Sequence, residues 1–384
     1  MNFEFATATR IVFGAGTVKL VGANANGFGR RALVVTGRQP ERAEKLLASL
    51  GESGVVPTVF SVAGEPDLAI IERGVASARA AQCEFVVGFG GGSVMDAGKA
   101  MAAMLTNGGE LLDYVEVIGR GKVLSQRSAP FIAIPTTAGT GAEVTRNAVL
   151  SAPEHKVKVS LRSPLMLPTV AVVDPELTYD LPPALTASTG LDALTQLIEP
   201  YVCLRANPLT DSLCQTGLQR AARSLRTAVF QGEQAAARED MAVASLFGGL
   251  ALANAGLGAV HGLAAPVGGQ FPAPHGAVCA ALLSPVMAVN LRALRERAPN
   301  SEAWGRYERV AGWLTGQSPA PAEAGVEWVQ RLVADLNIPG LRTYGVQPGH
   351  FAGLVAQATK ASSMKANPIA LTAEELTEIL QRAW

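Results

Sequence analysis

Two apolar segments of this chain each end in a loop of small residues, and this pattern narrows the folds that the chain can adopt. Residues 85–96 read FVVGFGGGSVMD, and residues 131–143 read FIAIPTTAGTGAE. In each, a buried-strand pattern stops where glycine or threonine lets the backbone approach a ligand, and a helix-start pattern follows. A helix N-terminus offers N–H groups and a positive dipole end, which suit a phosphate. Together the loops predict a site for a nucleotide with more than one phosphate.

Both loops carry the spacing of a capping box, which predicts a helix start directly after each loop. The boxes are Ser93-x-x-Asp96 and Thr140-x-x-Glu143. The glycines at 90–92 let a pyrophosphate lie against the backbone, and the threonines of the second loop add hydroxyl groups. Two ordinary capped helices after tight turns remain the alternative interpretation.

Other phosphate-binding motifs fit poorly. Five residues separate Gly92 from Gly98-Lys99, one more than a phosphate loop of the NTPase type has, and Ala100 lacks the hydroxyl that would bind magnesium. The segment at 14–19 (GAGTVK) lacks the last glycine of the dinucleotide fingerprint and is expected to be a turn. The interpretation as a phosphoryl-transfer enzyme is therefore disfavoured, and only an observed hydrolysis of a nucleoside triphosphate would support it.

The two halves of the chain have different periodicities. In the first half, apolar strands alternate with amphipathic helices, which predicts a parallel sheet covered by helices on both faces. After Pro182-Pro183 the periodicity is helical up to the last residue. We expect an α/β dinucleotide-binding domain at 1–180 and an all-helical domain at 181–384. Within the first domain we expect strands at 31–36, 55–62 and 170–175, helices at 40–50 and 67–81, and an edge pair of strands at 3–5 and 10–13.

Composition excludes several classes of protein. Lys plus Arg and Asp plus Glu both number 32, so no net charge attracts nucleic acid or an acidic membrane. The start of the chain has neither the basic residues nor the apolar run of a signal peptide, so we expect a cytoplasmic protein. The cysteines have no framework spacing and are expected to be buried free thiols: Cys83, Cys203, Cys214 and Cys279.

One uncharged stretch, residues 241–268, is long enough to span a membrane. It is rich in Gly, Ala, Ser and Asn, contains His261 and has no flanking aromatic belt. We therefore expect a buried pair of helices that pack through small residues, and no membrane span.

Four polar side chains in the helical half are candidate metal ligands. Asp192 and Gln196 are spaced i, i+4 and so share one helix face. His261 and His275 lie in Gly-rich, apolar surroundings, where an imidazole needs a partner such as a metal shared with a carboxylate. Without a family to compare, a pair of hydrogen-bonded core histidines is the favoured interpretation.

Taken together, these motifs resemble the iron-containing (group III) alcohol dehydrogenases of the dehydroquinate synthase-like fold. The resemblance extends over nearly the whole chain and in the same order. Its main parts are RIVFG at 10–14, GGGS at 90–93 with Asp96 and Lys99, PTTAGTG at 135–141, VDPEL at 173–177, residues 190–198, His261-Gly262 and Pro274-His275-Gly276.

The resemblance implies a nicotinamide-dinucleotide domain, a helical domain and an active-site cleft between them. It implies a divalent metal, iron or zinc, at Asp192, His261, His275 and the Gln196 position. Lys158 would lie beside the cofactor and the active site, and Asn147 near the substrate. The implied cofactor contacts are Gly91, Gly92 and Ser93 at the pyrophosphate, with Asp96, Thr136, Thr137, Thr140 and Lys158 along the groove.

Two departures from the family pattern concern the chemistry. The family's usual ligands are Asp, His, His and His, but the second position here is Gln196, whose neutral amide binds iron or zinc more weakly than imidazole. The family also commonly has a second histidine four residues after His261, implicated in proton exchange, where this chain has Ala265. The proton would then leave by water and ribose hydroxyls or by another group, or activity would be reduced.

The end of the second strand predicts the choice of cofactor. Family members that favour NAD tend to carry an Asp there, which binds the adenosine ribose and repels a 2′-phosphate. This chain has Gly37, and Arg38 or Arg42 could pair with that phosphate. We therefore expect NADP(H) to be preferred over NAD(H).

The resulting hypothesis is a cytoplasmic NAD(P)-dependent oxidoreductase that interconverts a small alcohol and its aldehyde or ketone with the help of a metal. The resemblance further implies a homodimer. Two alternatives follow from the departures: a metal-independent reductase like the maleylacetate reductases, and a nucleotide-binding protein without catalysis.

Overall fold

The computed structural model describes residues 2–155 and 157–384, and the chain divides into two compact units. The unit here called the α/β unit contains Ala6–Thr137 and Gly141–Tyr179. The unit here called the helical unit contains Ala138–Thr140, Asp180–Trp384 and residues 2–5. The predicted fold class, a parallel α/β part followed by a largely helical part, is confirmed.

The α/β unit is built on a six-stranded sheet in which every neighbouring pair of strands is parallel, in the order β1-β8-β5-β4-β2-β3. The inner strands β2, β4, β5 and β8 are buried on both faces, as expected for a parallel sheet, whereas the edge strands β1 and β3 are partly exposed. The strands are β1 (Arg10–Phe13), β2 (Arg31–Thr36), β3 (Val56–Ser61), β4 (Phe85–Gly90), β5 (Phe131–Pro135) and β8 (Val170–Val173).

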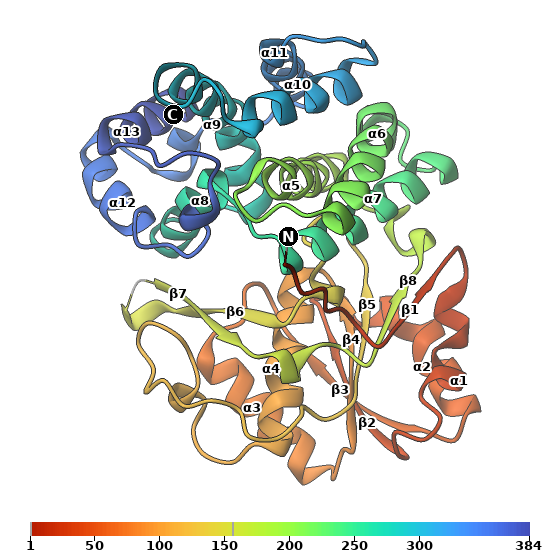
Figure 1. Cartoon of the computed structure of the whole chain (residues 1–384). Coiled ribbons are helices and arrows are strands. Elements are labelled where there is room, and N and C mark those ends of the chain that lie inside the picture. The colour runs from red at the N-terminus through yellow and green to blue at the C-terminus, as the bar shows by residue number, and fades with distance from the viewer. Residues whose placement is uncertain (1, 156) are drawn as a thin grey trace. The chain divides into compact units, whose positions relative to one another are not determined.

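Helices cover the sheet on both sides (Figure 1). Because successive side chains of a strand point to opposite faces, β2 contributes Ala32 and Val34 to one core and Leu33 and Val35 to the other. The first core includes helices α1 (Val21–Asn24) and α2 (Glu44–Glu52). The second includes α3 (Leu68–Ala80) and α4 (Gly92–Thr106).

The prediction of a helix after the second loop is wrong. Gly141 takes a left-handed conformation with φ 57°, and only the 3-10 turn Ala142–Val144 follows. The chain then forms an antiparallel hairpin of β6 (Asn147–Ala152) and β7 (Val157–Arg162). Alternate residues of β6 are buried, so the two-residue period of a strand prevails over the capping-box spacing.

Two further local predictions need correction. Helix α4 does begin directly after the first loop, but its N-cap is Gly91 and no side chain caps it, so Ser93 and Asp96 form no capping box. Residues 3–5 are not a strand, and Arg10–Phe13 pairs in parallel with β8 instead of forming an edge hairpin. A segment next to an apolar parallel strand can complete the sheet edge without a local turn.

The helical unit packs around α5 (Pro183–Val202), which contributes a nearly continuous series of buried residues to one core (Figure 1). Its Gly190 allows α6 to approach closely, because a Cβ there would lie 2.3 Å from Leu225 Cδ1. The other helices are α6 (Pro208–Phe230), α7 (Ala235–Asn254), α8 (Ala259–Gln270), α9 (His275–Arg297), α10 (Glu302–Thr315), α11 (Ala322–Asp335), α12 (Phe351–Ala358) and α13 (Ala373–Ala383).

The uncharged stretch at 241–268 forms parts of α7 and α8, which meet at an angle of 97°. Among the described residues, one helix, α9, is long and apolar enough to cross a membrane. Its most apolar window is 83% buried within the structure, as is typical of a core helix.

Candidate functional site

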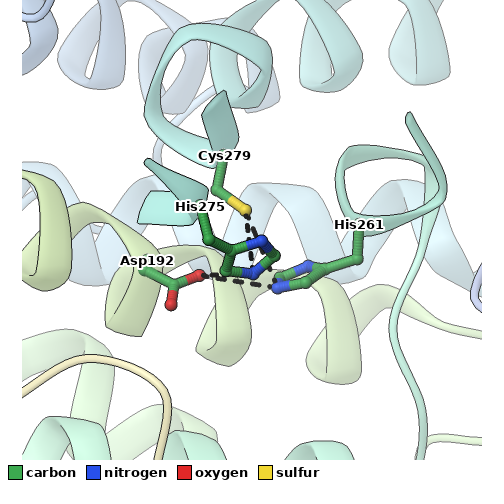
Figure 2. A group of neighbouring side chains, drawn as sticks. All are labelled: Asp192, His261, His275 and Cys279. Carbon is green, nitrogen blue, oxygen red and sulfur yellow. Dashed lines mark hydrogen bonds and ion pairs between the residues drawn. The ribbon is translucent and has the colours of Figure 1, made fainter. Parts of the chain in front are cut away.

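Four side chains that can bind a metal converge in the helical unit (Figure 2). Asp192 comes from the middle of α5, His261 from the first turn of α8, and His275 and Cys279 from the first two turns of α9. Their ligand atoms all lie within 4.8 Å of one another. The structure thus brings together three of the predicted ligands and adds a thiol.

The distances within this group are those of atoms that can share one ion. Asp192 Oδ1 lies 3.5 Å from His261 Nε2 and 3.8 Å from His275 Nε2. Cys279 Sγ lies 3.6 Å from His275 Nε2 and 3.8 Å from His261 Nε2. Both imidazoles therefore present the same nitrogen, Nε2, to the carboxylate and the thiol.

Close helix packing holds the group in place. A Cβ at Gly276 would lie 2.5 Å from the carbonyl oxygen of Ser188, so α9 begins directly against α5. Asp192 and His261 are almost fully buried, whereas the His275 side chain is 36% exposed. The group is accessible on the His275 side.

Glu199 fixes the orientation of His261. Its Oε2 lies 2.6 Å from His261 Nδ1, and its Oε1 accepts a 2.7 Å hydrogen bond from the backbone N–H of Val260. A carboxylate accepts a hydrogen bond at this contact, so Nδ1 carries a hydrogen, and in the neutral ring Nε2 keeps its lone pair. Histidine ligands of metals are usually oriented in this way.

The charges in the group shift the pKa of each titratable neighbour. Burial lowers the pKa of His261, but Cys279 and Glu199 outweigh it and leave that pKa well above its ordinary value. The pKa of His275 is raised by Cys279, against the effect of burial, and also by Asp192. Burial raises the pKa of Asp192, but His275 and His261 outweigh it and lower that pKa overall. The carboxylate is thus held ionised.

Two buried oxygens on α5 accept no hydrogen bond from the part of the chain that the structure describes: Asp192 Oδ1 and Gln196 Oε1. Gln196 lies one turn after Asp192 on α5 and is equally buried. A buried acceptor without a partner costs about 1–3 kcal/mol, which a cation between these groups would offset. The residues present therefore fit a divalent metal.

Two members of this site, Cys279 and Glu199, were not identified from the sequence. Cys279 follows His275 at i+4, and Glu199 follows Asp192 at i+7, so each shares a helix face with a predicted ligand. These two spacings were the signal in the sequence that could have identified both residues.

In the α/β unit, the predicted cofactor loops lie at the carboxyl ends of neighbouring strands. Gly90 pairs with Pro135 in the sheet, and the Thr136 N–H donates to the carbonyl oxygen of Gly90 at 2.9 Å. A Cβ at Gly91 would lie 3.4 Å from the Thr137 side chain. The glycine loop with Gly92 and Ser93 is therefore adjacent to the threonine loop.

Gly37 and Arg38 follow β2, the other neighbour of β4. The chain runs outward from β2 to β3 and then returns to β4 on the other side of β2, so the strand order reverses between β2 and β4. In open α/β sheets, ligands bind outside the carboxyl ends of strands at such a switch point. Arg38 is exposed, while Arg42 Nη2 donates to the carbonyl oxygen of Leu177.

Two of the remaining predicted residues, Asp96 and Lys158, form ion pairs with neighbouring side chains. Asp96 pairs with the buried Lys99 at 3.0 Å. Lys158, on β7, pairs with Glu65 at 2.6 Å, and Asn147 begins β6. Thr140 belongs to the helical unit, next to Gly139, which approaches α5 closely.

Comparison with known proteins extends over the whole chain. The family described as "Iron-containing alcohol dehydrogenase" matches residues 8–175, and "Fe-containing alcohol dehydrogenase family, C-terminal" matches residues 186–384. The 1,3-propanediol dehydrogenase of Klebsiella pneumoniae is 36% identical over 391 residues, which cover 100% of this chain and 99% of that relative.

Two solved structures superpose closely on this chain over its whole length. A 1,3-propanediol oxidoreductase superposes with a TM-score of 0.93 at 34% identity, covering 100% of both chains. The sulfoacetaldehyde reductase of Bifidobacterium kashiwanohense, solved in complex with NAD⁺, superposes with a TM-score of 0.87 at 29% identity, covering 100% of this chain and 99% of its own.

Proposed function

We infer the function of this chain from its family. The chain belongs to the iron-containing alcohol dehydrogenase family and is an oxidoreductase that interconverts alcohols and aldehydes. The resemblance seen in the sequence motifs is thereby confirmed. The family binds a divalent metal and NAD(H). The metal ligands, the choice between NAD(H) and NADP(H), and the assembly of this chain are our proposals.

We propose that Asp192, His261 and His275 hold the divalent metal. The observation that carries this proposal is the buried Asp192 Oδ1, which has no hydrogen-bond partner in the described structure and lies near both Nε2 atoms. Such a cation, when bound, polarises the carbonyl oxygen of the aldehyde and stabilises alkoxide charge. Glu199 keeps the proton on His261 Nδ1, and the partly exposed His275 side leaves the site accessible to a small substrate.

For the cofactor we propose NADP(H) over NAD(H), bound at the carboxyl ends of β2, β4 and β5. Gly37 leaves no carboxylate after β2, and the exposed Arg38 beside it can pair with a 2′-phosphate. The bare start of α4 after Gly91 suits the pyrophosphate. The proposed contacts are Gly37, Arg38, Gly91, Gly92, Ser93, Asp96, Thr136, Thr137, Thr140 and Lys158, with Asn147 and Lys158 as candidate catalytic residues.

The test is steady-state reduction of short-chain aldehydes by protein that has been purified without chelators. We expect NADPH to give the higher kcat/KM and elemental analysis to give one metal per chain. A clear preference for NADH would refute the cofactor proposal.

Two alternatives are favoured by Gln196 and Ala265, since both positions depart from the family pattern. Turnover that persists after complete removal of the metal would indicate a metal-independent reductase like the maleylacetate reductases. Dinucleotide binding with neither metal nor turnover would indicate a non-catalytic protein. We further propose a homodimer in the cytoplasm, and light scattering coupled to gel filtration tests the assembly.

A further inference from the structure

We propose that Cys279 supplies the fourth protein ligand of the metal site, in place of the histidine that Gln196 replaces. The inference rests on the proposed function, because it concerns the metal of that same site. It gives the metal one carboxylate, two imidazoles and one thiolate.

The geometry of the four donors supports this assignment. With bonds of about 2.0–2.1 Å to oxygen and nitrogen and about 2.3 Å to sulfur, a tetrahedral metal holds neighbouring N and S about 3.6 Å apart and O and N about 3.3 Å apart. Cys279 Sγ lies 3.6 and 3.8 Å from the two Nε2 atoms, and Asp192 Oδ1 lies 3.5 and 3.8 Å from them. These four distances are within about half an ångström of the tetrahedral values, and all the ligand atoms lie within 4.8 Å of one another.

The local fold aims the thiol at the histidines. Cys279 is one turn after His275 on α9, so the two side chains lie on the same helix face. Figure 2 shows the sulfur directed toward both imidazoles, which the Asp192 carboxylate also approaches. Cys279 is fully buried, so this contact is part of the packed interior.

Independent evidence for a ligand comes from Asp192 and Gln196. Asp192 is only 1% exposed, yet its Oδ1 accepts no hydrogen bond within the described chain, and the buried Gln196 Oε1 likewise accepts none. The neutral Gln196 amide is a weak donor to a transition metal. A carboxylate and a thiolate together balance the charge of a divalent cation, which the Asp and Gln pair does not.

The thiolate also changes the expected metal. Thiolate is a soft ligand, and sites that mix sulfur with imidazole are typical of zinc, whereas iron(II) in enzymes is commonly held by histidine and carboxylate. We therefore expect this chain to favour zinc or cobalt(II) over iron(II) by a wider margin than a site with three histidines does.

The test reads the coordination of the metal. The full-length chain is loaded with one equivalent of Zn²⁺ for X-ray absorption and, separately, with Co²⁺ for optical spectroscopy. We expect one sulfur at about 2.3 Å from zinc and a thiolate-to-cobalt charge-transfer band in the near ultraviolet. Both signals should disappear in Cys279→Ser. The matched control Cys214→Ser should retain them, because Cys214, equally buried, lies on α6 and does not belong to the metal-binding group.

A second pair of variants checks the exchange of ligands. Cys279→Ala should lower the affinity for Zn²⁺ by at least about 100-fold. This decrease is larger than the one caused by replacing a residue outside the ligand shell. Adding Gln196→His to Cys279→Ala should restore most of that affinity without restoring the sulfur signal. If Cys279→Ala does not fold, the spectra of the unmodified chain still decide.

Only nitrogen and oxygen around zinc in the unmodified chain would overturn the inference, as would the failure of the chain to retain any metal. These results are distinct from failure of the proposed function. If the chain reduces aldehydes with NADPH and its metal has no sulfur ligand, the proposed function holds and the Cys279 inference fails. If the metal is bound by sulfur but the chain has no turnover, the inference holds and the proposed function fails.

Discussion

His261 Nδ1 lies 2.6 Å from Glu199 Oε2, so the orientation of a proposed metal ligand is set by a carboxylate that itself stays outside the metal-binding group. Glu199 is held in turn by the backbone N–H of Val260, next to the histidine. The pair therefore fixes both the direction of the ring and the tautomer that leaves Nε2 available.

Replacement of this carboxylate should weaken metal binding. In Glu199→Gln the amide oxygen can still accept the Val260 N–H, but the amide NH₂ then faces His261 Nδ1. The histidine would shift its proton to Nε2, where it blocks coordination. We expect the affinity for Zn²⁺ to fall about 10–100-fold, measured by competition with a fluorescent chelator. Glu302→Gln, which replaces an exposed carboxylate on α10, is the control, and equal affinities in both variants would contradict this role for Glu199.

The sequence predicted most of the α/β unit because its inner strands are apolar, and β4 and β5 end at glycine and proline, so local pattern and tertiary position agree. It failed at the second loop, where the spacing of Thr140 and Glu143 imitates a capping box. Gly141 instead adopts a left-handed conformation, and the following residues form β6. The spacing of a capping box is compatible with a helix start, but it does not by itself show that a helix follows.

The metal-binding group was predicted only in part, for a different reason. Asp192, His261 and His275 were found through their motifs. The spacing of Cys279 places it on the helix face of His275, but its approach to His261 is evident only once α8 and α9 converge. A cysteine in an apolar helix is indistinguishable by composition from a core residue. Contact between helices distant in sequence cannot be derived from periodicity alone.

The buried Glu143 should make the stability of the α/β unit depend on pH. Burial raises the pKa of Glu143 from its ordinary 4.5 to about 7, against the effect of its own backbone and of Lys99. Between these values the folded chain holds a proton that the unfolded chain has lost, so stability falls as the pH rises through this window. At about 1.4 kcal/mol per pKa unit the total is on the order of 3 kcal/mol.

Glu143→Gln should remove this dependence, because the amide has no proton to lose. We expect the stability of the variant relative to the unmodified chain to rise between pH 5 and pH 8, measured by urea unfolding with chelator present. Glu176→Gln, at an exposed position, is the control. Parallel pH profiles for Glu143→Gln and the unmodified chain would show that Glu143 titrates normally.

The first loop gives a test that separates cofactor binding from folding. A Cβ at Gly91 would make only ordinary contact, 3.4 Å, with the Thr137 side chain, so Gly91→Ala should fold with a small change in Tm. Its methyl group would occupy space at the bare start of α4. We expect the Kd for NADPH to rise at least about tenfold, about 1.4 kcal/mol, by fluorescence titration.

Gly51→Ala is the matched control, since a Cβ there, on α2, meets nothing within 4 Å. This change should leave the Kd for NADPH unaltered and stabilise the helix by up to about 1 kcal/mol. If Gly91→Ala also binds NADPH normally, the pyrophosphate lies elsewhere.

Cofactor choice should be reversible at a single position. A Cβ at Gly37 meets no atom within 4 Å, so Gly37→Asp can be accommodated without displacing its neighbours. A carboxylate about 4 Å from a 2′-phosphate costs between about 1 and 4 kcal/mol, depending on solvent exposure. The ratio of kcat/KM for NADH to that for NADPH should therefore rise roughly tenfold or more, measured by initial rates with one aldehyde.

Arg38→Ala should instead lower the kcat/KM for NADPH without raising that for NADH, because it removes an attraction to the phosphate and adds no contact to the ribose. An unmodified chain that already prefers NADH, or a ratio unchanged by both substitutions, would place the adenosine ribose away from the end of β2.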